Sequence, residues 1–110
     1  MESKEFGHSM VMKFADKVEY SSEGIVSKRV LQKEKGNVSL FAFDKGQQLS
    51  EHSAPFDAMV QVLEGEGEIK INGRSFTLLE GETIIMPANV PHAVFAAEKF
   101  KMLLTMIKSE

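Results

Sequence analysis

The sequence predicts an all-β domain, an antiparallel sandwich or barrel, and three observations support this fold class. From Gly24 onward, runs rich in β-branched and aromatic residues are separated at short intervals by turn residues. Segments with the periodicity of a long amphipathic helix are absent from the sequence. Asn72-Gly73 stands between two alternating runs, which is typical of a tight hairpin. The 110 residues, 43% of them hydrophobic, suffice for one domain with one modest core.

The elements follow in order along a single domain that spans residues 1–110. Residues 1–23 are expected to form an N-terminal arm, and residues 24–107 the barrel. Within the arm, residues 14–20 could be a single helical turn or an extended segment, since their periodicity is too short to decide. Glycines mark the turns between the later runs. The predicted strands are residues 25–31, 38–43, 59–63, the two arms of a hairpin over 68–76, 83–86, 91–96 and 100–107.

Two of the predicted strands, 38–43 and 100–107, are apolar on both faces. An outer strand of a lone sandwich alternates with polar residues instead, so something should cover the second face of these strands. A symmetric homodimer would bury this surplus, and closed two-fold dimers are the commonest oligomers. We therefore expect a homodimer.

Composition excludes several classes of function. The formal net charge is −3 and the lysines are interleaved with acids, so nucleic acid is not an expected partner. The chain has no cysteine, which leaves neither disulfides nor thiolate catalysis. An apolar run of the kind found in signal peptides or membrane spans is missing, so we expect a cytoplasmic protein without a membrane partner.

His52 and His92 are the candidate functional residues. Each lies at a fixed offset from the glycines and prolines that punctuate short strands. Neutral imidazole binds metals and titrates near neutral pH, so two histidines brought together can share a metal, a ligand or a proton. His8 lies in the predicted arm and is interpreted as a surface residue.

The pattern around His52 is similar to the first motif of the small single-domain cupins, the RmlC-like superfamily. That motif runs glycine, five residues, His-x-His, three or four residues, glutamate, six residues, glycine. Gly46, His52 and Gly65 hold their places in it. Ala54 stands where the second histidine would be, and Ala58 where the glutamate would be.

The pattern around His92 resembles the second motif of the same family. Gly81, Pro87 and His92 hold their places. Asn89 replaces a glycine, which is a mild change because asparagine tolerates left-handed backbone better than most residues. Ala96 replaces the final asparagine of the motif.

The resemblance covers most of the chain between residues 24 and 107, and it implies a double-stranded β-helix, or jelly-roll, cupin barrel. Active members of the family hold iron, manganese, nickel or zinc on three histidines and a glutamate. Here His52 and His92 alone remain of that set, and two neutral nitrogens make a weak metal site. Asp57 is a possible third ligand, because it lies one position before Ala58, where the family has its glutamate. A shift of one residue along a strand turns the side chain to the other face unless a bulge intervenes. Gln61 could offer an amide oxygen.

The predicted ligand pocket surrounds the two histidines. Ala54 and Ala58 are small where family members carry bulky ligands, which should leave room for an organic molecule or water. An apolar cavity could be lined by larger side chains, although methionines are also common fillers of a plain core. These candidates are Phe56, Met59, Met86, Phe95, Met102 and Met106.

The predicted function is therefore the binding of a small molecule in the barrel around His52 and His92, with a possible weak metal site. Whether a reaction is catalysed stays open at this point. One alternative is a metal-dependent small-molecule enzyme of the dioxygenase, isomerase or decarboxylase type. Another is a dimeric scaffold with a vestigial pocket.

Overall fold

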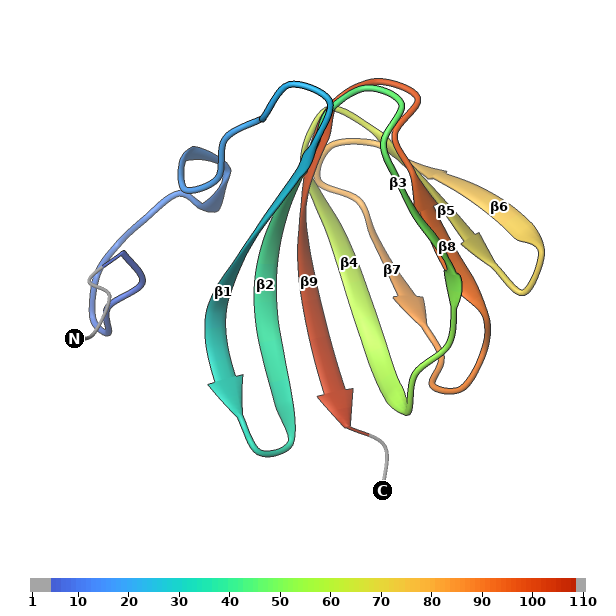
Figure 1. Cartoon of the computed structure of the whole chain (residues 1–110). Coiled ribbons are helices and arrows are strands. Elements are labelled where there is room, and N and C mark those ends of the chain that lie inside the picture. The colour runs from blue at the N-terminus through green and yellow to red at the C-terminus, as the bar shows by residue number, and fades with distance from the viewer. Residues whose placement is uncertain (1–4, 109–110) are drawn as a thin grey trace.

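The computed structural model describes residues 5–108, which form two antiparallel sheets that face each other, with the N-terminal segment to one side (Figure 1). The all-β fold class is confirmed. One sheet has the strand order β1-β2-β9-β4-β7 and the other the order β3-β8-β5-β6. The elements are a short 3-10 helix η1 (Phe14–Asp16) and the strands β1 (Ile25–Lys33), β2 (Gly36–Phe43), β3 (Gln48–His52), β4 (Phe56–Glu64), β5 (Gly67–Ile71), β6 (Arg74–Leu78), β7 (Thr83–Met86), β8 (His92–Phe95) and β9 (Phe100–Lys108).

The predicted hairpin is confirmed at β5 and β6. Asn72 and Gly73 have φ angles of 50° and 83°, the positive values that a two-residue turn between antiparallel strands requires. Ile71 pairs with Arg74 across this turn. Asn89 also has a positive φ, 63°, as expected for a residue that takes the place of a glycine.

The main core lies between the two sheets. Phe43 of β2 and Phe100 of β9 stack there, with ring centroids 4.8 Å apart and planes within 5° of parallel. Gly67 begins β5 directly beside Phe100, where a Cβ atom would lie 2.5 Å from the ring. The other buried residues of this cluster are Ala58, Val60, Val62, Ile69, Leu78, Met86, Val94, Ala96 and Met102.

The N-terminal segment covers part of the outer face of the five-stranded sheet. Val18 is fully buried there against Leu40 and Ala42 of β2, which are fully buried as well. The Tyr20 hydroxyl donates a hydrogen bond to a Glu64 carboxylate oxygen at 2.6 Å, and the Lys101 ammonium donates to the Ala15 carbonyl at 2.6 Å. This segment therefore covers the outer face of 38–43 and the start of 100–107, whereas Ile107 near the end of the second run stays 61% exposed.

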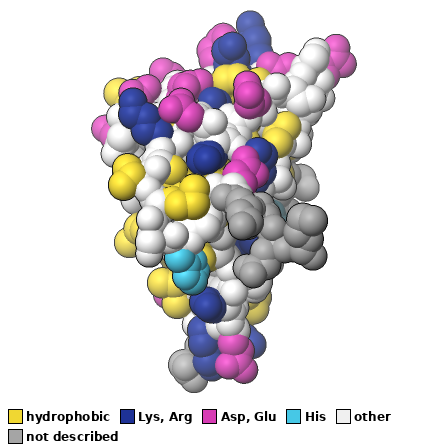
Figure 2. All heavy atoms as spheres, turned by 90° about the vertical axis from the view of Figure 1, so that its left-hand side faces the viewer, with side chains coloured by type: hydrophobic (Ala, Val, Ile, Leu, Met, Phe, Trp, Pro, Cys, Tyr) yellow, Lys and Arg dark blue, Asp and Glu magenta, His cyan; other side chains and the backbone are white. Residues whose placement is uncertain are grey.

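Seen from the side of the N-terminal segment, charged side chains of both signs are interspersed with small hydrophobic patches (Figure 2). Residues 1–4 of the predicted arm, and residues 109–110 of the predicted domain, lie outside the described residues. None of the described residues belongs to a helix long and apolar enough to cross a membrane.

Candidate functional site

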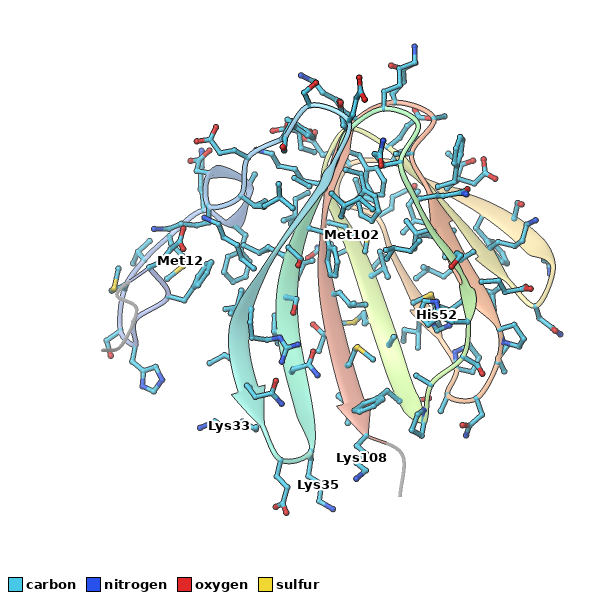
Figure 3. The ribbon with its side chains drawn as sticks, in the orientation of Figure 1. Met12, Lys33, Lys35, His52, Met102 and Lys108 are labelled. Atoms are coloured by element: carbon cyan, nitrogen blue, oxygen red, sulfur yellow. The ribbon has the colours of Figure 1, made fainter. Side chains whose placement is uncertain are left out.

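His52 and His92 meet across the two sheet strands that carry them. His52 ends β3 and His92 begins β8, and the two residues are paired directly in the antiparallel register. Their ring centroids are 4.5 Å apart and the rings meet edge to face at 68°. His92 is buried, with 7% of its surface exposed, whereas His52 lies at the rim. The predicted meeting of the two histidines is thus present, and Figure 3 shows His52 pointing from β3 toward the interior between the sheets.

Each imidazole is held by a backbone carbonyl two residues earlier in the chain. Nδ1 of His52 lies 2.8 Å from the Ser50 carbonyl oxygen, and Nδ1 of His92 lies 3.2 Å from the Val90 carbonyl oxygen. A carbonyl oxygen can only accept, so Nδ1 carries the hydrogen in both rings. In the neutral form of each ring, Nε2 then holds a free lone pair.

The environment of His92 favours its neutral form. Burial lowers the pKa of His92, and the nearby His52 lowers it further, because a positive charge on both rings would be repulsive. The hydrogen bond to the Val90 carbonyl opposes this shift of the pKa but does not reverse it. His92 therefore presents a lone pair rather than a charge at neutral pH.

The two imidazoles border a small cavity between the sheets, which we call the histidine pocket. Its volume is about 50 Å³. Apart from the two rings, the lining is apolar or thioether. The lining residues are Leu49, His52, Met86, His92, Val94, Met102, Leu104 and Met106.

A larger hollow of about 380 Å³ lies elsewhere, over the exposed side chains of Glu51, Lys70 and Phe95. Charged side chains of both signs meet solvent there, and neither His52 nor His92 lines it. The side chains that could donate a lone pair to a ligand, the two imidazoles and the thioethers, line the smaller histidine pocket instead.

The predicted pocket residues divide into two groups. Met86 lines the histidine pocket; Ala58, which is 3% exposed, does not line it but pairs with Met86 across β4 and β7. Ala54 and Phe56 do not line it. The Ala54 carbonyl accepts a hydrogen bond from the Asn89 backbone at 2.8 Å, and Phe56 pairs with a residue at the end of β9.

The two possible third metal ligands are not brought to the histidines. Asp57 is exposed, and its carboxylate accepts a hydrogen bond from the Ala88 backbone at 2.9 Å. Gln61 shares the strand parity of Asp57, opposite to that of buried Ala58, and is likewise absent from the pocket lining. Within residues 5–108, no three histidine, cysteine, aspartate or glutamate side chains gather as a metal site would require.

Sequence reasoning found the methionines of the lining and missed its aliphatic members. Met59 and Phe95, which were also candidates for an apolar cavity, are 40% and 37% exposed. Leu104 could have been found, because it shares strand parity with Met102 and Met106. Leu49 and Val94 lie on β3 and β8, and pair with each other.

Comparison with known families and structures gives consistent results. The family described as "Cupin domain" matches residues 39–108. A conserved protein of unknown function from Streptococcus pyogenes is 37% identical, with a TM-score of 0.91 over 97% of this chain and 94% of that chain. A cupin 2 conserved barrel domain protein from Leptotrichia buccalis is 44% identical, with a TM-score of 0.83 over 86% of this chain and 46% of that chain.

A third solved structure supports the fold alone. A cupin superfamily protein from Desulfitobacterium hafniense is 24% identical and covers 100% of both chains with a TM-score of 0.88. Comparison with proteins of curated function gave no match.

Proposed function

The chain belongs to the cupin domain family, and from that premise we propose that it is a binding protein whose ligand occupies the histidine pocket. The ligand is held jointly by Nε2 of His52 and Nε2 of His92. One observation carries this proposal: both Nδ1 atoms are tied to carbonyl oxygens, which leaves two lone pairs beside one cavity. Two such acceptors suit a metal ion or a molecule that donates hydrogen bonds.

The size of the pocket limits the ligand. Its 50 Å³ compares with about 30 Å³ for one water molecule in the liquid and with roughly 300–1,000 Å³ for pockets that hold drug-sized molecules. The room expected above Ala58 is taken up because Met86 and Met106 pair with it on either side. A metal ion or a molecule of a few heavy atoms fits; a larger organic molecule requires these side chains to move.

The metal set implied by the family does not fit these residues. Ala54 and Ala58 offer no donor atoms where a histidine and a glutamate would bind. Asp57, the nearest carboxylate in sequence, is exposed and engaged with the Ala88 backbone. A hard divalent ion would lack a carboxylate to neutralise it, so the proposed function is binding rather than metal-dependent catalysis.

Native mass spectrometry of untagged protein, purified without chelator, tests the proposal. The expected result is a species heavier than the bare chain, and its mass excess identifies the ligand. The His52→Ala/His92→Ala double variant should lose this excess, whereas His8→Ala, whose side chain is exposed outside the pocket, should keep it. Wild-type protein that carries nothing, or an excess that survives in the double variant, would contradict the proposal.

A further inference from the structure

The histidine pocket is rich in sulfur. Three of the seven methionines in the chain, Met86, Met102 and Met106, line this one small cavity. Met86 and Met102 are 2% and 1% exposed. Figure 3 shows Met102 in the interior, between the sheet that contains β9 and the sheet that contains β3. Thioether side chains, two buried and the third, Met106, half-buried, therefore share one small cavity with two imidazoles.

The strand register places two of these methionines beside one particular position. Ala58 of β4 pairs with Met86 of β7 on one side and with Met106 of β9 on the other. Directly paired residues of adjacent antiparallel strands have Cβ atoms about 4.5–5.5 Å apart. Ala58 occupies the position where the motif of the family has its glutamate. The place of a hard carboxylate ligand is thus flanked by two soft thioethers.

This donor set discriminates among metals. Thioether ligands are soft and favour copper(I), imidazole accepts copper among several transition metals, and carboxylate, carbonyl and water oxygens suit magnesium, calcium and manganese. The charge of the ion also favours copper(I) over a divalent metal. The cost of removing an ion from water rises with the square of its charge, and the pocket lining contains no carboxylate to offset that cost. A monovalent ion is therefore the least costly metal to bury here, and 50 Å³ is enough for it.

We propose that the ligand of the histidine pocket is a single copper(I) ion, bound by Nε2 of His52, Nε2 of His92 and the thioether sulfurs of Met86 and Met106. This inference rests on the proposed function, since it names the occupant of the same pocket. Its new element is the thioether pair, which the two-histidine pattern alone does not require.

The competing interpretation is that the methionines only fill an irregular core, as methionine commonly does. Leucine distinguishes the two roles, because the exchange of methionine for leucine conserves volume and apolar character but removes the sulfur. Met86→Leu/Met106→Leu is therefore the test variant. Met59→Leu is the matched control, because Met59 lies on β4 next to Ala58 but is 40% exposed and outside the pocket.

The experiment is an anaerobic titration of apo protein with copper(I), in competition with the chromophoric chelator bicinchoninate. Wild type and Met59→Leu should each bind one copper(I) per chain with equal affinity. Met86→Leu/Met106→Leu should bind at least tenfold more weakly, while the unfolding temperature of its apo form stays close to that of the wild type. X-ray absorption of the wild-type complex should show sulfur as well as nitrogen in the first coordination sphere.

The results separate this inference from the proposed function. Copper(I) affinity that is unchanged in Met86→Leu/Met106→Leu but lost in His52→Ala/His92→Ala would overturn the thioether set and leave a histidine-held ligand. Failure of wild-type protein to compete for copper(I), while a different mass excess depends on both histidines, would overturn copper as the occupant. A wild type that neither competes for copper(I) nor carries any histidine-dependent ligand would overturn both.

Discussion

At the scale of single residues, His52 and His92 make the same local hydrogen bond. Each ring donates its Nδ1 hydrogen to the carbonyl two residues earlier, Ser50 for one and Val90 for the other. The backbone just before each ring, in β3 for His52 and in the turn that precedes β8 for His92, therefore fixes the tautomer, and the pairing of β3 with β8 brings both imidazoles to one pocket. The two histidines differ in exposure, because His92 is buried and His52 lies at the rim.

The free energy of unfolding should fall as the pH is lowered, because of His92. Burial and the neighbouring His52 lower its pKa in the folded state below the ordinary value of 6.5. Above pH 6.5 the ring is neutral in both states; as the pH falls, the unfolded state binds the proton first, and stability is lost through the folded-state pKa. The unfolding temperature of the metal-free wild type should therefore fall more steeply between pH 8 and pH 4.5 than that of His92→Gln. Parallel pH profiles for the two proteins would contradict this assignment.

Tyr20 should stabilise the N-terminal segment through its hydroxyl. Its hydrogen bond to Glu64 is 2.6 Å long, and burial together with this carboxylate raises the pKa of the phenol. Tyr20→Phe should lower the free energy of unfolding by about 1 kcal/mol, measured by urea denaturation. In a double-mutant cycle with Glu64→Ala, which removes the acceptor, the two effects should be less than additive, and strict additivity would show that the bond contributes nothing.

The strands differ in how far their sequence predicts them. The hairpin of β5 and β6 was predictable because Asn72-Gly73 determines the turn locally. β3 was missed, because Gln48–His52 is mostly polar and exposed and pairs with β8 alone, in an irregular register. Its strand conformation depends on β8, a partner distant in the sequence, so the local pattern does not reveal it.

Gly67 should be required by the packing of β5 on β9. A Cβ at this position would lie 2.5 Å from the Phe100 ring, which is itself stacked against Phe43 and cannot easily retreat. Gly67→Ala should cost roughly 1–3 kcal/mol of stability, as overpacking of a core does. Gly24→Ala is the matched control, since the nearest atom to its Cβ would be 3.6 Å away, and it should change stability little. Equal effects of the two substitutions in urea denaturation would contradict this account of the packing.

The same contrast between local and distant causes applies to the site. The meeting of His52 and His92 was predicted from the resemblance of the two motifs to those of the cupins, and the two residues lie at the end of β3 and the start of β8. The small volume of the pocket was not, since it depends on Met86 and Met106, which reach Ala58 from strands on either side of β4. Cross-strand neighbours are set by register, and register was not predictable from the separate runs.

At the scale of the whole molecule, residues 5–108 leave part of the outer face of the five-stranded sheet exposed. The N-terminal segment packs over β2, while on the same outer face Met59, Ile85 and Ile107 are 40%, 65% and 61% exposed. Met59 pairs with Ile85 across β4 and β7, so these side chains adjoin. The predicted homodimer would bury them across a two-fold axis.

Sedimentation equilibrium measures the oligomeric state directly. We expect a mass of twice the 12.3 kDa of one chain. Ile85→Glu should shift the mass toward the monomer, because it places a charge in the apolar patch at its most exposed residue. Leu79→Glu, at a residue 52% exposed in the loop that follows β6, should leave the mass unchanged. A wild type that stays monomeric at all concentrations would contradict the dimer.

The central claim is that two imidazoles with free Nε2 lone pairs hold one ligand together. Long-range ¹H–¹⁵N NMR of the histidine side chains tests this most directly, before and after addition of one equivalent of copper(I) to apo protein. The account predicts that His52 and His92 both carry hydrogen on Nδ1 in the apo form, and that both Nε2 resonances shift on binding while His8 does not respond. An Nε2–H tautomer at either pocket histidine, or a response confined to one ring, would contradict it.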